Sequence, residues 1–332
     1  MNSFVGIDIA AKSFDVVVRQ DNKNSKVVTY SQHKNDFKKL IDKLVKLSPE
    51  HIVMEATGIY YLDLAKALFK AGLPVSVINP RSFKNFADTL LKRTKTDSVD
   101  ASLLAEYGQR MTPALWTAPD ESLMELRDIS RQINRLVHMN TKAKNILHAL
   151  CATEGTNKHV IEDEKEGILF NEKRIERMRN LAMELIKANE KLKRQFDNIT
   201  SAIGIGDNSA ICMMGELNIL PKDLKAPQVC HYAGLSVRLT QSGTSVKSPG
   251  RLSKAGNTYL RNAFFMPAMS ASTHDPNVRA FKEALVLRGK KNIQAICAIM
   301  RKYLMGVWAC IKNDTPFDSS KLFSEEHKSA CA

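Results

Sequence analysis

The sequence predicts an α/β protein with a mixed sheet near its N-terminus and mainly helical structure beyond it. Three observations lead to this fold class. Short apolar segments alternate with segments of helical spacing over the first hundred residues, the pattern then becomes wholly helical, and a Ser/Gly-rich stretch interrupts the last third. We therefore expect three domains, at residues 1–115, 116–200 and 201–332.

The N-terminal segments follow the order three strands, helix, strand, helix, strand. The expected strands are Phe4–Ile9, Phe14–Val18, Lys26–Tyr30, Ile52–Met54 and Val75–Ile78. Apolar residues keep helical spacing from Phe37 to Leu47, which predicts one helix, and a second helix is expected at Leu62–Phe69. Asn79-Pro80 ends the last strand. This order is typical of a ribonuclease H type sheet, but it also suits actin-like ATPases, so it does not decide function by itself.

Two long amphipathic helices are expected in the middle of the chain. The first covers Glu121–Ala152, a charged connector covers Glu162–Glu166, and the second covers Glu172–Phe196. Such helices form an antiparallel hairpin or a coiled-coil assembly arm, and packing onto their own domain fits the spacing equally well.

The last third begins with Ile203-Gly204-Ile205-Gly206, which suits either a phosphate-binding hairpin or an ordinary turn between helices. Gly234–Gly256 is rich in Ser, Gly, Thr and Lys and is expected to form a loop region. Apolar helices are expected at Leu260–Met269 and Ile293–Cys310.

The basic charge is concentrated near the C-terminus. The chain carries a formal charge of +14, and the window from His231 to Ile311 holds twelve Lys or Arg against two acids, Asp275 and Glu283. Such an excess repels itself unless a polyanion neutralises it, and nucleic acid is the commonest one. A basic surface kept for solubility is the alternative.

Membrane and disulfide chemistry have little support. No apolar run reaches the length of a membrane span, and no signal peptide is indicated at the N-terminus. The six cysteines show neither a CxxC pair nor His partners at zinc spacing, so reduced and mostly buried thiols are expected.

Four acids stand where a metal site could form. Asp8 lies inside an apolar strand, Glu55 ends another, and Asp97 and Asp100 lie three residues apart at a helix start, on one helical face. Asp97 could simply cap that helix and Glu55 could mark a strand end, whereas a carboxylate inside an apolar strand needs a partner. Phosphodiester chemistry uses divalent ions, and Mg²⁺ prefers a few carboxylates plus water, with Mn²⁺ as the alternative ion.

A serine loop lies within the basic window. Ser242 precedes Gly243-Thr244-Ser245, and the nearby cations Arg238, Lys247, Arg251 and Lys254 could bind a phosphate. Such loops are more often flexible linkers. No histidine base of the triad type is evident nearby, which argues against an acyl-transfer hydrolase.

Eight short segments follow one another along the chain in a specific order and spacing. They are Gly6-Ile7-Asp8, Glu55-Ala56-Thr57-Gly58-Ile59-Tyr60, Val77-Ile78-Asn79-Pro80, Lys95-Thr96-Asp97-Ser98-Val99-Asp100-Ala101, Gly204-Ile205-Gly206, Ala233-Gly234-Leu235, Ser242-Gly243-Thr244-Ser245 and Ser253-Lys254-Ala255-Gly256-Asn257. In this order and spacing, they resemble the DEDD transposases of bacterial and archaeal insertion sequences, a family that includes a pilin-gene invertase and bridge-RNA-guided recombinases. The resemblance covers nearly the whole chain.

The resemblance implies a Holliday-junction-resolvase-like catalytic domain whose acids Asp8, Glu55, Asp97 and Asp100 bind Mg²⁺. By motif position it implies that Ser242, in a C-terminal transposase domain, becomes covalently linked to DNA. It further implies a structured guide RNA, dimers that pair into a tetramer, and a cytoplasmic prokaryotic protein that joins the nucleoid when active. Ile203 and Val237 stand where proline is usual, which puts only local loop shape in doubt.

Several other functions remain to be weighed. A metal-only nuclease or junction resolvase would use water instead of Ser242, and an invertase would use the same chemistry as a transposase. An actin-like ATPase would need glycine-rich phosphate loops, and none with convincing spacing follows. A non-catalytic nucleic-acid-binding protein leaves the placement of the four acids unexplained.

Overall fold

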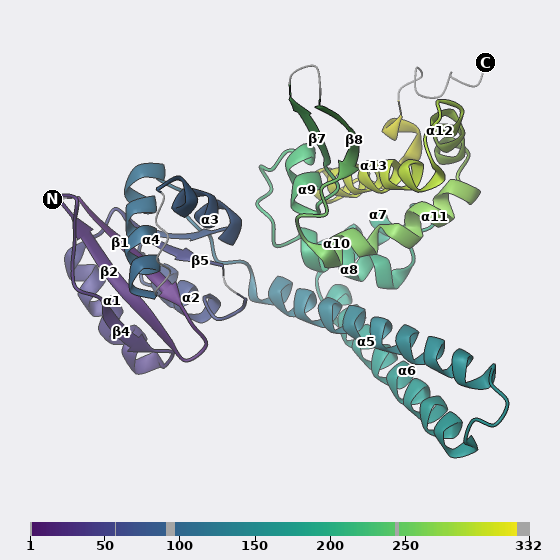
Figure 1. Ribbon diagram of the computed structural model, residues 1–332, viewed down its shortest axis with the longest axis horizontal. Helices are drawn as coiled ribbons and strands as arrows, with labels where there is room; N and C mark the ends of the chain where they lie inside the picture. Colours follow the sequence, from purple (N-terminus) through teal and green to yellow (C-terminus); the bar gives the residue numbers. More distant parts are fainter. Residues whose placement is uncertain (1, 57, 91–96, 243–245, 324–332) are drawn as a thin grey trace. The chain divides into compact units, whose positions relative to one another are not determined.

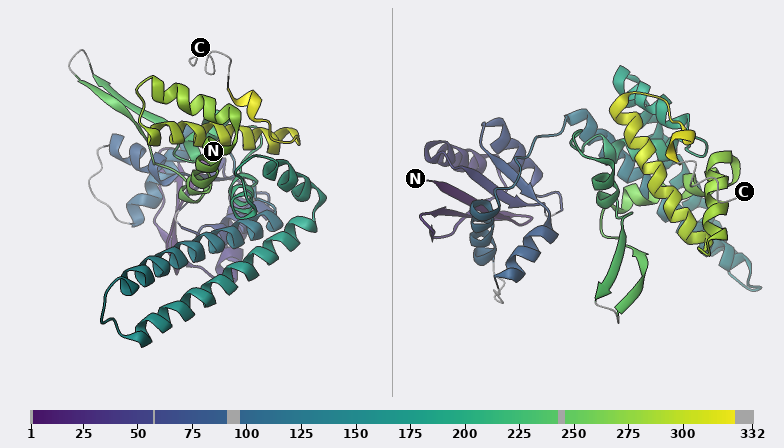
Figure 2. Two further views of the ribbon diagram at one scale, coloured as in Figure 1. Left: turned by 90° about the vertical axis from the view of Figure 1, so that its right-hand side faces the viewer. Right: turned by 90° about the horizontal axis from the view of Figure 1, so that it is seen from above.

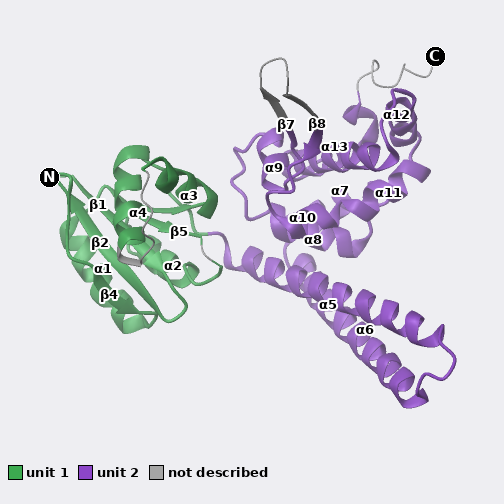
Figure 3. Cartoon of the chain, in the orientation of Figure 1, with its two compact units in different colours: residues 1–118 green, residues 119–332 purple. Residues whose placement is uncertain are grey.

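The computed structural model describes residues 2–56, 58–90, 97–242 and 246–323, without the side chains of residues 97–98, 239–242 and 246–249. The chain forms two compact units, Met1–Ala118 (unit 1) and Pro119–Ala332 (unit 2), coloured separately in Figure 3. The expected helical region 116–200 and the C-terminal part 201–332 fall mostly in unit 2. Their separation into two domains stays a proposal.

Unit 1 contains a mixed sheet with the strand order β3-β2-β1-β5-β6, and β4 also pairs with β2 (Figure 1). The strands are β1 Ser3–Ile9, β2 Ser13–Gln20, β3 Lys23–Asn24, β4 Val28–Ser31, β5 His51–Glu55 and β6 Val75–Ile78. β2 runs antiparallel to β1, whereas β5 is parallel to β1 and β6 to β5. This is the predicted ribonuclease H type of sheet. The third strand was expected at Lys26–Tyr30; it begins later, as β4, and the short β3 precedes it.

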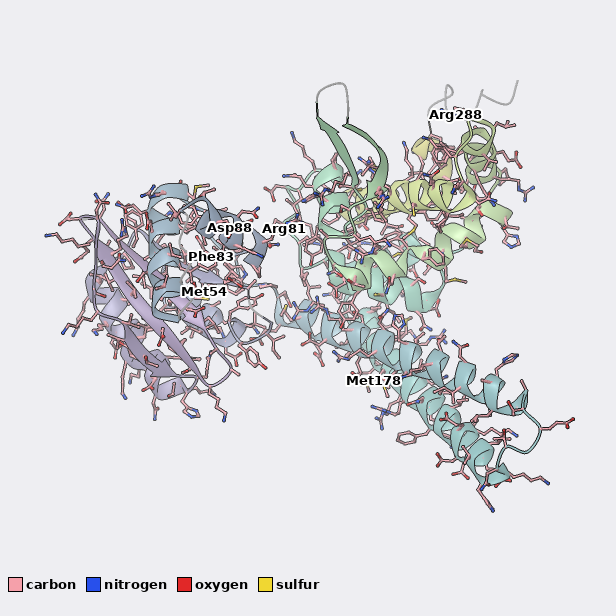
Figure 4. The ribbon with its side chains drawn as sticks, in the orientation of Figure 1. Met54, Arg81, Phe83, Asp88, Met178 and Arg288 are labelled. Carbon is pink, nitrogen blue, oxygen red and sulfur yellow. The ribbon has the colours of Figure 1, made fainter. Side chains whose placement is uncertain are left out.

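Helices pack on both faces of this sheet. They are α1 Lys34–Leu47, α2 Leu62–Lys70, α3 Pro80–Thr89 and α4 Asp97–Met111. Neighbouring β5 residues serve different cores: Met54 packs with residues of α1 and α2, and Val53 packs with α3 and α4. Met54, together with Phe83 of the second core, is labelled in Figure 4. The sheet therefore has an α4 face and an opposite α1/α2 face.

Helix α3 was not expected, because Asn79-Pro80 was interpreted only as a strand end. The side chain of Asn79 accepts a hydrogen bond from the amide of Arg81, and Pro80 occupies the first helical turn. Asparagine as an N-cap followed by proline is a helix start signal as well as a strand stop signal. The same dipeptide ends β6 and begins α3.

Unit 2 begins with a helical hairpin made of α5 Glu121–Cys151 and α6 Lys158–Lys187, which lie side by side in Figures 1 and 2. Glu162–Glu166 was expected to be a connector, but it lies inside α6. The second helix was expected at Glu172–Phe196. The structure instead ends α6 at Lys187 and starts α7, Glu190–Thr200, after Asn189, whose side chain accepts hydrogen bonds from two α7 amides.

The rest of unit 2 is a helical core around α13 with one β-hairpin. The remaining helices are α8 Asp207–Leu217, α9 Ala226–Tyr232, α10 Thr258–Ala263, α11 Phe265–His274, α12 Pro276–Leu287, α13 Asn292–Asn313 and the short 3₁₀ helix η1 Ser319–Leu322. The expected helix Leu260–Met269 is interrupted at Phe264, and α12 was not expected. Tyr303 and Trp308 of α13 are among the largest buried side chains.

The Gly204 segment is a turn between α7 and α8. Gly204 has φ of +90°, and a Cβ there would lie 2.8 Å from the carbonyl oxygen of Pro267 in α11. Close packing against α11 and the left-handed backbone account for this glycine without a phosphate.

Within the described part of the chain, no helix is both long and apolar enough to span a membrane.

Three of the free cysteines, Cys212, Cys230 and Cys310, are buried, whereas Cys151 is exposed and Cys297 is partly exposed. Cys331 lies outside the described residues.

Candidate active site

Asp8 and Glu55 stand side by side at one end of the unit 1 sheet. β1 and β5 are parallel, with Gly6 opposite Val53. Two residues further along the same register, Asp8 comes level with Glu55, the last residue of β5. Since side chains alternate between the faces of a strand, Asp8 shares a face with Gly6 and Glu55 shares one with Val53. Val53 packs with α3 and α4, so both acids belong to the α4 face.

Gly6 lets α4 lie directly on β1. A Cβ on Gly6 would stand 2.0 Å from the carbonyl oxygen of Ala101 and 2.4 Å from the amide nitrogen of Ala105. No side chain fits between these backbones. The glycine two residues before Asp8 therefore determines how closely the helix that carries Asp97 and Asp100 approaches the central strand.

The direction of α4 brings its first turn to the same end of the sheet. Gly108, near the end of α4, lies beside Phe4 and His51, which belong to the beginnings of β1 and β5. The helix thus runs antiparallel to β1. Asp97 and Asp100, in its first turn, are consequently at the end of the sheet that holds Asp8 and Glu55.

A fifth acid, Asp15, was missed by the sequence analysis. It pairs directly with Asp8 across β1 and β2, and its Oδ1 accepts a 2.6 Å hydrogen bond from the Thr29 hydroxyl. Directly opposed residues of antiparallel strands share a face, and like charges there repel. The alternation of Phe14, Asp15 and Val16 was the available signal. A cation at this end of the sheet would relieve that repulsion.

The donor set suits a divalent metal, although the side chains do not form a closed cage. Asp8, Glu55 and Asp100 are partly exposed, and each already takes part in an interaction. Among the described residues, no three His, Cys, Asp or Glu side chains are grouped closely enough to hold a metal. The side chain of Asp97 is outside the described part. The backbone thus gathers four carboxylate positions of the kind Mg²⁺ uses.

The serine lies on a β-hairpin of unit 2, where Gly234–Gly256 was expected to form a loop region. β7 covers Val237–Ser242 and β8 covers Val246–Leu252, with Ser242 paired to Val246. Ser242 is therefore the last residue of β7. Residues 243–245, including Ser245, lie outside the described residues, as do the side chains of Ser242 and Lys247.

Two of the predicted phosphate-binding cations, Arg238 and Arg251, face each other across this hairpin. They are directly paired in the β7–β8 register, and both are exposed. Opposed like charges destabilise a strand pair, and an anion between them reverses the effect. Lys254, also exposed, follows β8 with a left-handed φ of +53°. The base of the hairpin is thus a cationic surface.

A buried polar network anchors the hairpin base to α5. Glu216 of α8 is fully buried; its Oε1 lies 2.5 Å from Arg131 Nε and its Oε2 lies 3.0 Å from Arg131 Nη2. Asn257 donates through Nδ2 to Glu216 Oε2 at 2.5 Å and to the Tyr232 hydroxyl at 3.0 Å. Arg131 also lies 5.1 Å from the ring centroid of Tyr259.

Electrostatics support a charged pair in this network. Burial alone would lower the pKa of Arg131, but its hydrogen bond to Glu216 and the carboxylate charge raise that pKa above its ordinary value. Burial raises the pKa of the Tyr232 hydroxyl, so it stays protonated. Arg131, Glu216 and Tyr232 were not predicted as functional residues from the sequence. An acid inside the apolar helix α8 was the available signal.

Two glycines lie just outside the hairpin, Gly234 before β7 and Gly256 after β8. Gly256 has φ of +148°, and a Cβ there would lie 2.3 Å from the carbonyl oxygen of Tyr232. Gly234 has φ of +71°, and Arg261 donates to the carbonyl oxygens of Ala233 and Lys254, both at 3.1 Å. The two segments Ala233-Gly234-Leu235 and Ser253–Asn257, far apart in the predicted loop, therefore meet at the hairpin base.

Two family models and several known proteins are similar to this chain in sequence. A family model of IS110-type DEDD transposases, described as a transposase, matches residues 5–153, and the model of the transposase IS116/IS110/IS902 family matches residues 197–283. The pilin gene-inverting proteins of Moraxella bovis and Moraxella lacunata are each 28% identical over 321 residues, which cover 95% of this chain and 98% of theirs. An uncharacterised 43.6 kDa protein of insertion element IS110 from Streptomyces coelicolor is 26% identical over 36% of this chain and 30% of its own length.

Among solved structures, RuvC of Thermus thermophilus in complex with a Holliday junction substrate matches 35% of this chain and 99% of its own, with a TM-score of 0.26 and 15% identity. The first family model covers the positions of the four carboxylates, and the second covers the serine hairpin. The chain belongs to the IS110 family of DEDD transposases.

Proposed function

We propose that this protein is a transposase or site-specific recombinase that cuts and rejoins DNA strands with Asp8, Glu55, Asp97 and Asp100 as metal ligands and Ser242 as nucleophile. The observation that carries the proposal is that the four acid positions lie at one end of the sheet, two at the ends of β1 and β5 and two in the first turn of α4. The serine assignment rests on the motif position at the end of β7 and on the cations that the same hairpin carries at its base.

A divalent ion, Mg²⁺ or Mn²⁺, would neutralise charge on the scissile phosphate and on the leaving oxygen. The carboxylates of Asp8 and Glu55, on neighbouring strands, would hold it from the sheet, and those of Asp97 and Asp100 would hold it from the helix. Each of these acids repels its neighbours without a cation. Their role is to keep the ion at a fixed place against a rigid core.

In the cleavage step, the Oγ of Ser242 forms a bond to phosphorus, and the bond from phosphorus to one sugar oxygen breaks. The serine hydroxyl loses its proton, and the departing sugar oxygen gains one. One phosphate ester replaces another, so the reverse attack by a sugar hydroxyl rejoins DNA without ATP. This suits a chain in which no nucleotide-binding motif of convincing spacing was found.

The cations at the hairpin base would hold the phosphates that flank the cut. Arg238 and Arg251 form the opposed pair, and Lys247 and Lys254 extend the surface along β8 and beyond it. The positive charges of these side chains repel each other in the free protein. A bound polyanion removes this repulsion and also makes direct contacts, and both effects favour binding.

The partners are DNA, a structured guide RNA and further copies of the chain, assembled as dimers that pair into a tetramer. Each serine cuts one strand and recombination breaks four, so four protomers are the natural count. The α5–α6 hairpin offers exposed apolar side chains for assembly, including Leu169 (57% exposed) and Phe170 (63%). Leu126 and Ile133 of α5 are not available for such contacts, because they are buried in the chain's own core.

Inversion of a DNA segment is a second candidate outcome of the same chemistry. The pilin gene-inverting proteins match this chain over nearly its full length, which favours it. A plasmid that carries one segment between candidate ends distinguishes the outcomes: an invertase flips the segment, and a transposase moves it to a second plasmid.

The metal site is tested by Asp8→Ala, with strand cleavage measured in Mg²⁺. We expect cleavage to disappear while the urea midpoint stays the same or rises, because one of several repelling carboxylates is removed. The matched control is Asp42→Ala, which removes an exposed acid of α1, on the opposite face of the sheet. Full activity of Asp8→Ala, or activity in excess chelator, would contradict the proposal, because strand cleavage would then not depend on this metal site.

A further inference from the structure

A cavity of about 700 Å³ lies in unit 2 between the hairpin base and the helices α12 and α13. Its apolar wall is made by Leu235, Leu252, Phe281, Leu285 and Met305. Val237, the first residue of β7, and Ile293 also line it and are each more than half exposed. Its size is that of a small-molecule site.

Cations surround this apolar wall. Lys290, Arg301 and Lys302 line the cavity, and Lys254 lies close enough to lower the pKa of the Cys297 thiol in its wall, although burial raises that pKa more strongly. No acid is among the described residues that line the cavity. An apolar side chain of a protein partner would gain nothing from these charges. An apolar ring joined to an anion would use both features.

The position of the cavity along β7 relates it to the proposed cut. Val237 lines the cavity, and Ser242 ends the same strand five residues later. At about 3.3 Å per residue, the two are at most roughly 17 Å apart. The rise along a DNA strand is about 3.4 Å per nucleotide, so a strand with a phosphate at Ser242 has a base opposite the cavity within roughly five nucleotides.

We propose that this cavity receives one unstacked base of the DNA strand that Ser242 cuts, with Lys290, Arg301 and Lys302 on the adjoining phosphates. The proposal rests on the proposed function and adds a base-binding site to it. The apolar wall contacts the faces of the base, and a guanidinium such as that of Arg301 can stack on it. Holding one base outside the stack positions the neighbouring phosphates relative to the hairpin.

Cys297 provides a direct readout, because it is partly exposed in the cavity wall. The full chain is treated with N-ethylmaleimide, and modification of each cysteine is followed by mass spectrometry. The probe is a short thymidine oligonucleotide at ten times its Kd, and binding is measured separately by fluorescence anisotropy. We expect Cys297 to react about tenfold more slowly, since only the free fraction reacts. Cys151, exposed at the end of α5, should react equally fast with and without the oligonucleotide.

An abasic strand of the same length distinguishes protection by a base from protection by the phosphates. At equal occupancy it should leave the Cys297 rate unchanged. Equal protection by both strands would show that phosphates merely cover the cavity and would overturn the proposal. Protection that increases with protein concentration in the absence of DNA would instead assign the cavity to a second copy of the chain.

Filling the cavity gives an independent test. Ala298→Phe adds a ring to the cavity wall, and Ala309→Phe adds the same ring at an exposed position of the same helix. Ala298→Phe should weaken oligonucleotide binding about tenfold, within the range for one lost base-stacking contact. Its salt dependence should not change, since the phosphate contacts remain.

The outcomes distinguish the cavity from the wider function. Unchanged affinity in Ala298→Phe, with the chain folded by circular dichroism, would overturn the cavity proposal and leave DNA cleavage untouched. If the oligonucleotide fails to bind the wild-type chain at all, then this proposal and the DNA-binding surface both fall.

Discussion

Gly6→Ala tests whether the approach of α4 to β1 assembles the active site. The new methyl carbon would stand 2.0 Å from the carbonyl oxygen of Ala101 and 2.4 Å from the amide nitrogen of Ala105. Ordinary contacts begin near 3.4 Å. Both atoms belong to the helix backbone and cannot rotate away. The helix, or the strand beneath it, must therefore move by more than an ångström.

Gly6→Ala should lower the cleavage rate much more than it lowers the stability of the fold. Overpacking of this kind costs about 1–3 kcal/mol, and replacing glycine returns roughly 0.4–1 kcal/mol through the unfolded chain. A domain stable by about 5–15 kcal/mol stays folded after such a loss. Catalysis is more sensitive, because a shift of about 1 Å in catalytic groups can lower the rate roughly 100-fold. Asp97 and Asp100 would undergo such a shift relative to Asp8.

The assay pairs urea unfolding with Mg²⁺-dependent cleavage of a DNA substrate. Gly167→Ala is the control, because a Cβ there meets open space on α6 and should raise stability by roughly 0.5–1 kcal/mol without affecting cleavage. If Gly6→Ala cleaves at the wild-type rate, the first turn of α4 does not complete the site, and our reasoning about Asp97 and Asp100 is refuted.

Three further predictions concern unit 2. Replacing Arg251 and Lys254 with Gln should reduce the slope of log affinity for DNA against log salt concentration by up to about two, whereas Gln at the exposed α1 residues Lys38 and Lys43 should leave the slope unchanged. An unchanged slope in the first variant would place Arg251 and Lys254 outside the interface. Leu169→Glu with Phe170→Glu should lower the oligomeric state measured by light scattering on DNA, and a wild-type chain that is strictly monomeric there would refute the assembly role. Arg131→Met should lower the free energy of unfolding by about 3–5 kcal/mol, because it leaves the Glu216 carboxylate buried without its cation. Arg135→Met, at an exposed position of the same helix, should change the free energy of unfolding by less than about 0.5 kcal/mol, and equal effects of the two variants would contradict the role of the network.

The sheet could be predicted from sequence because its strands are short apolar runs bounded by turns. β6 lies at the predicted residues, and β1, β2 and β5 extend the predicted runs by one to two residues at their ends. The strand order was also within reach, since the sequence of strands and helices is typical of this topology. The position of α4 on Gly6 was not, because a glycine in a strand does not reveal which backbone approaches it.

The errors in unit 2 come from local composition that tertiary pairing overrides. The acids of Glu162–Glu166 suggested a connector, yet they lie within a long helix whose apolar residues pack against α5, and three of them, Glu162, Asp163 and Glu166, are exposed. Gly234–Gly256 carries the composition of a loop, and only the pairing of β7 with β8 makes it a hairpin. The motif positions of Asp8, Glu55 and Ser242 were available from sequence, but the Arg131–Glu216–Asn257 network joins residues more than a hundred positions apart.

The most direct test of serine chemistry is a covalent protein–DNA adduct on a denaturing gel. With end-labelled DNA and Mg²⁺, we expect the wild-type chain to carry label after boiling in detergent, and Ser242→Ala to bind the same DNA normally but carry none. Ser242→Cys should retain at most a trace, because sulfur is nucleophilic but the metal assistance suits oxygen. An adduct that persists in Ser242→Ala and disappears in Ser245→Ala would move the nucleophile three residues along, and cleavage without any adduct would make water the nucleophile and contradict the serine mechanism.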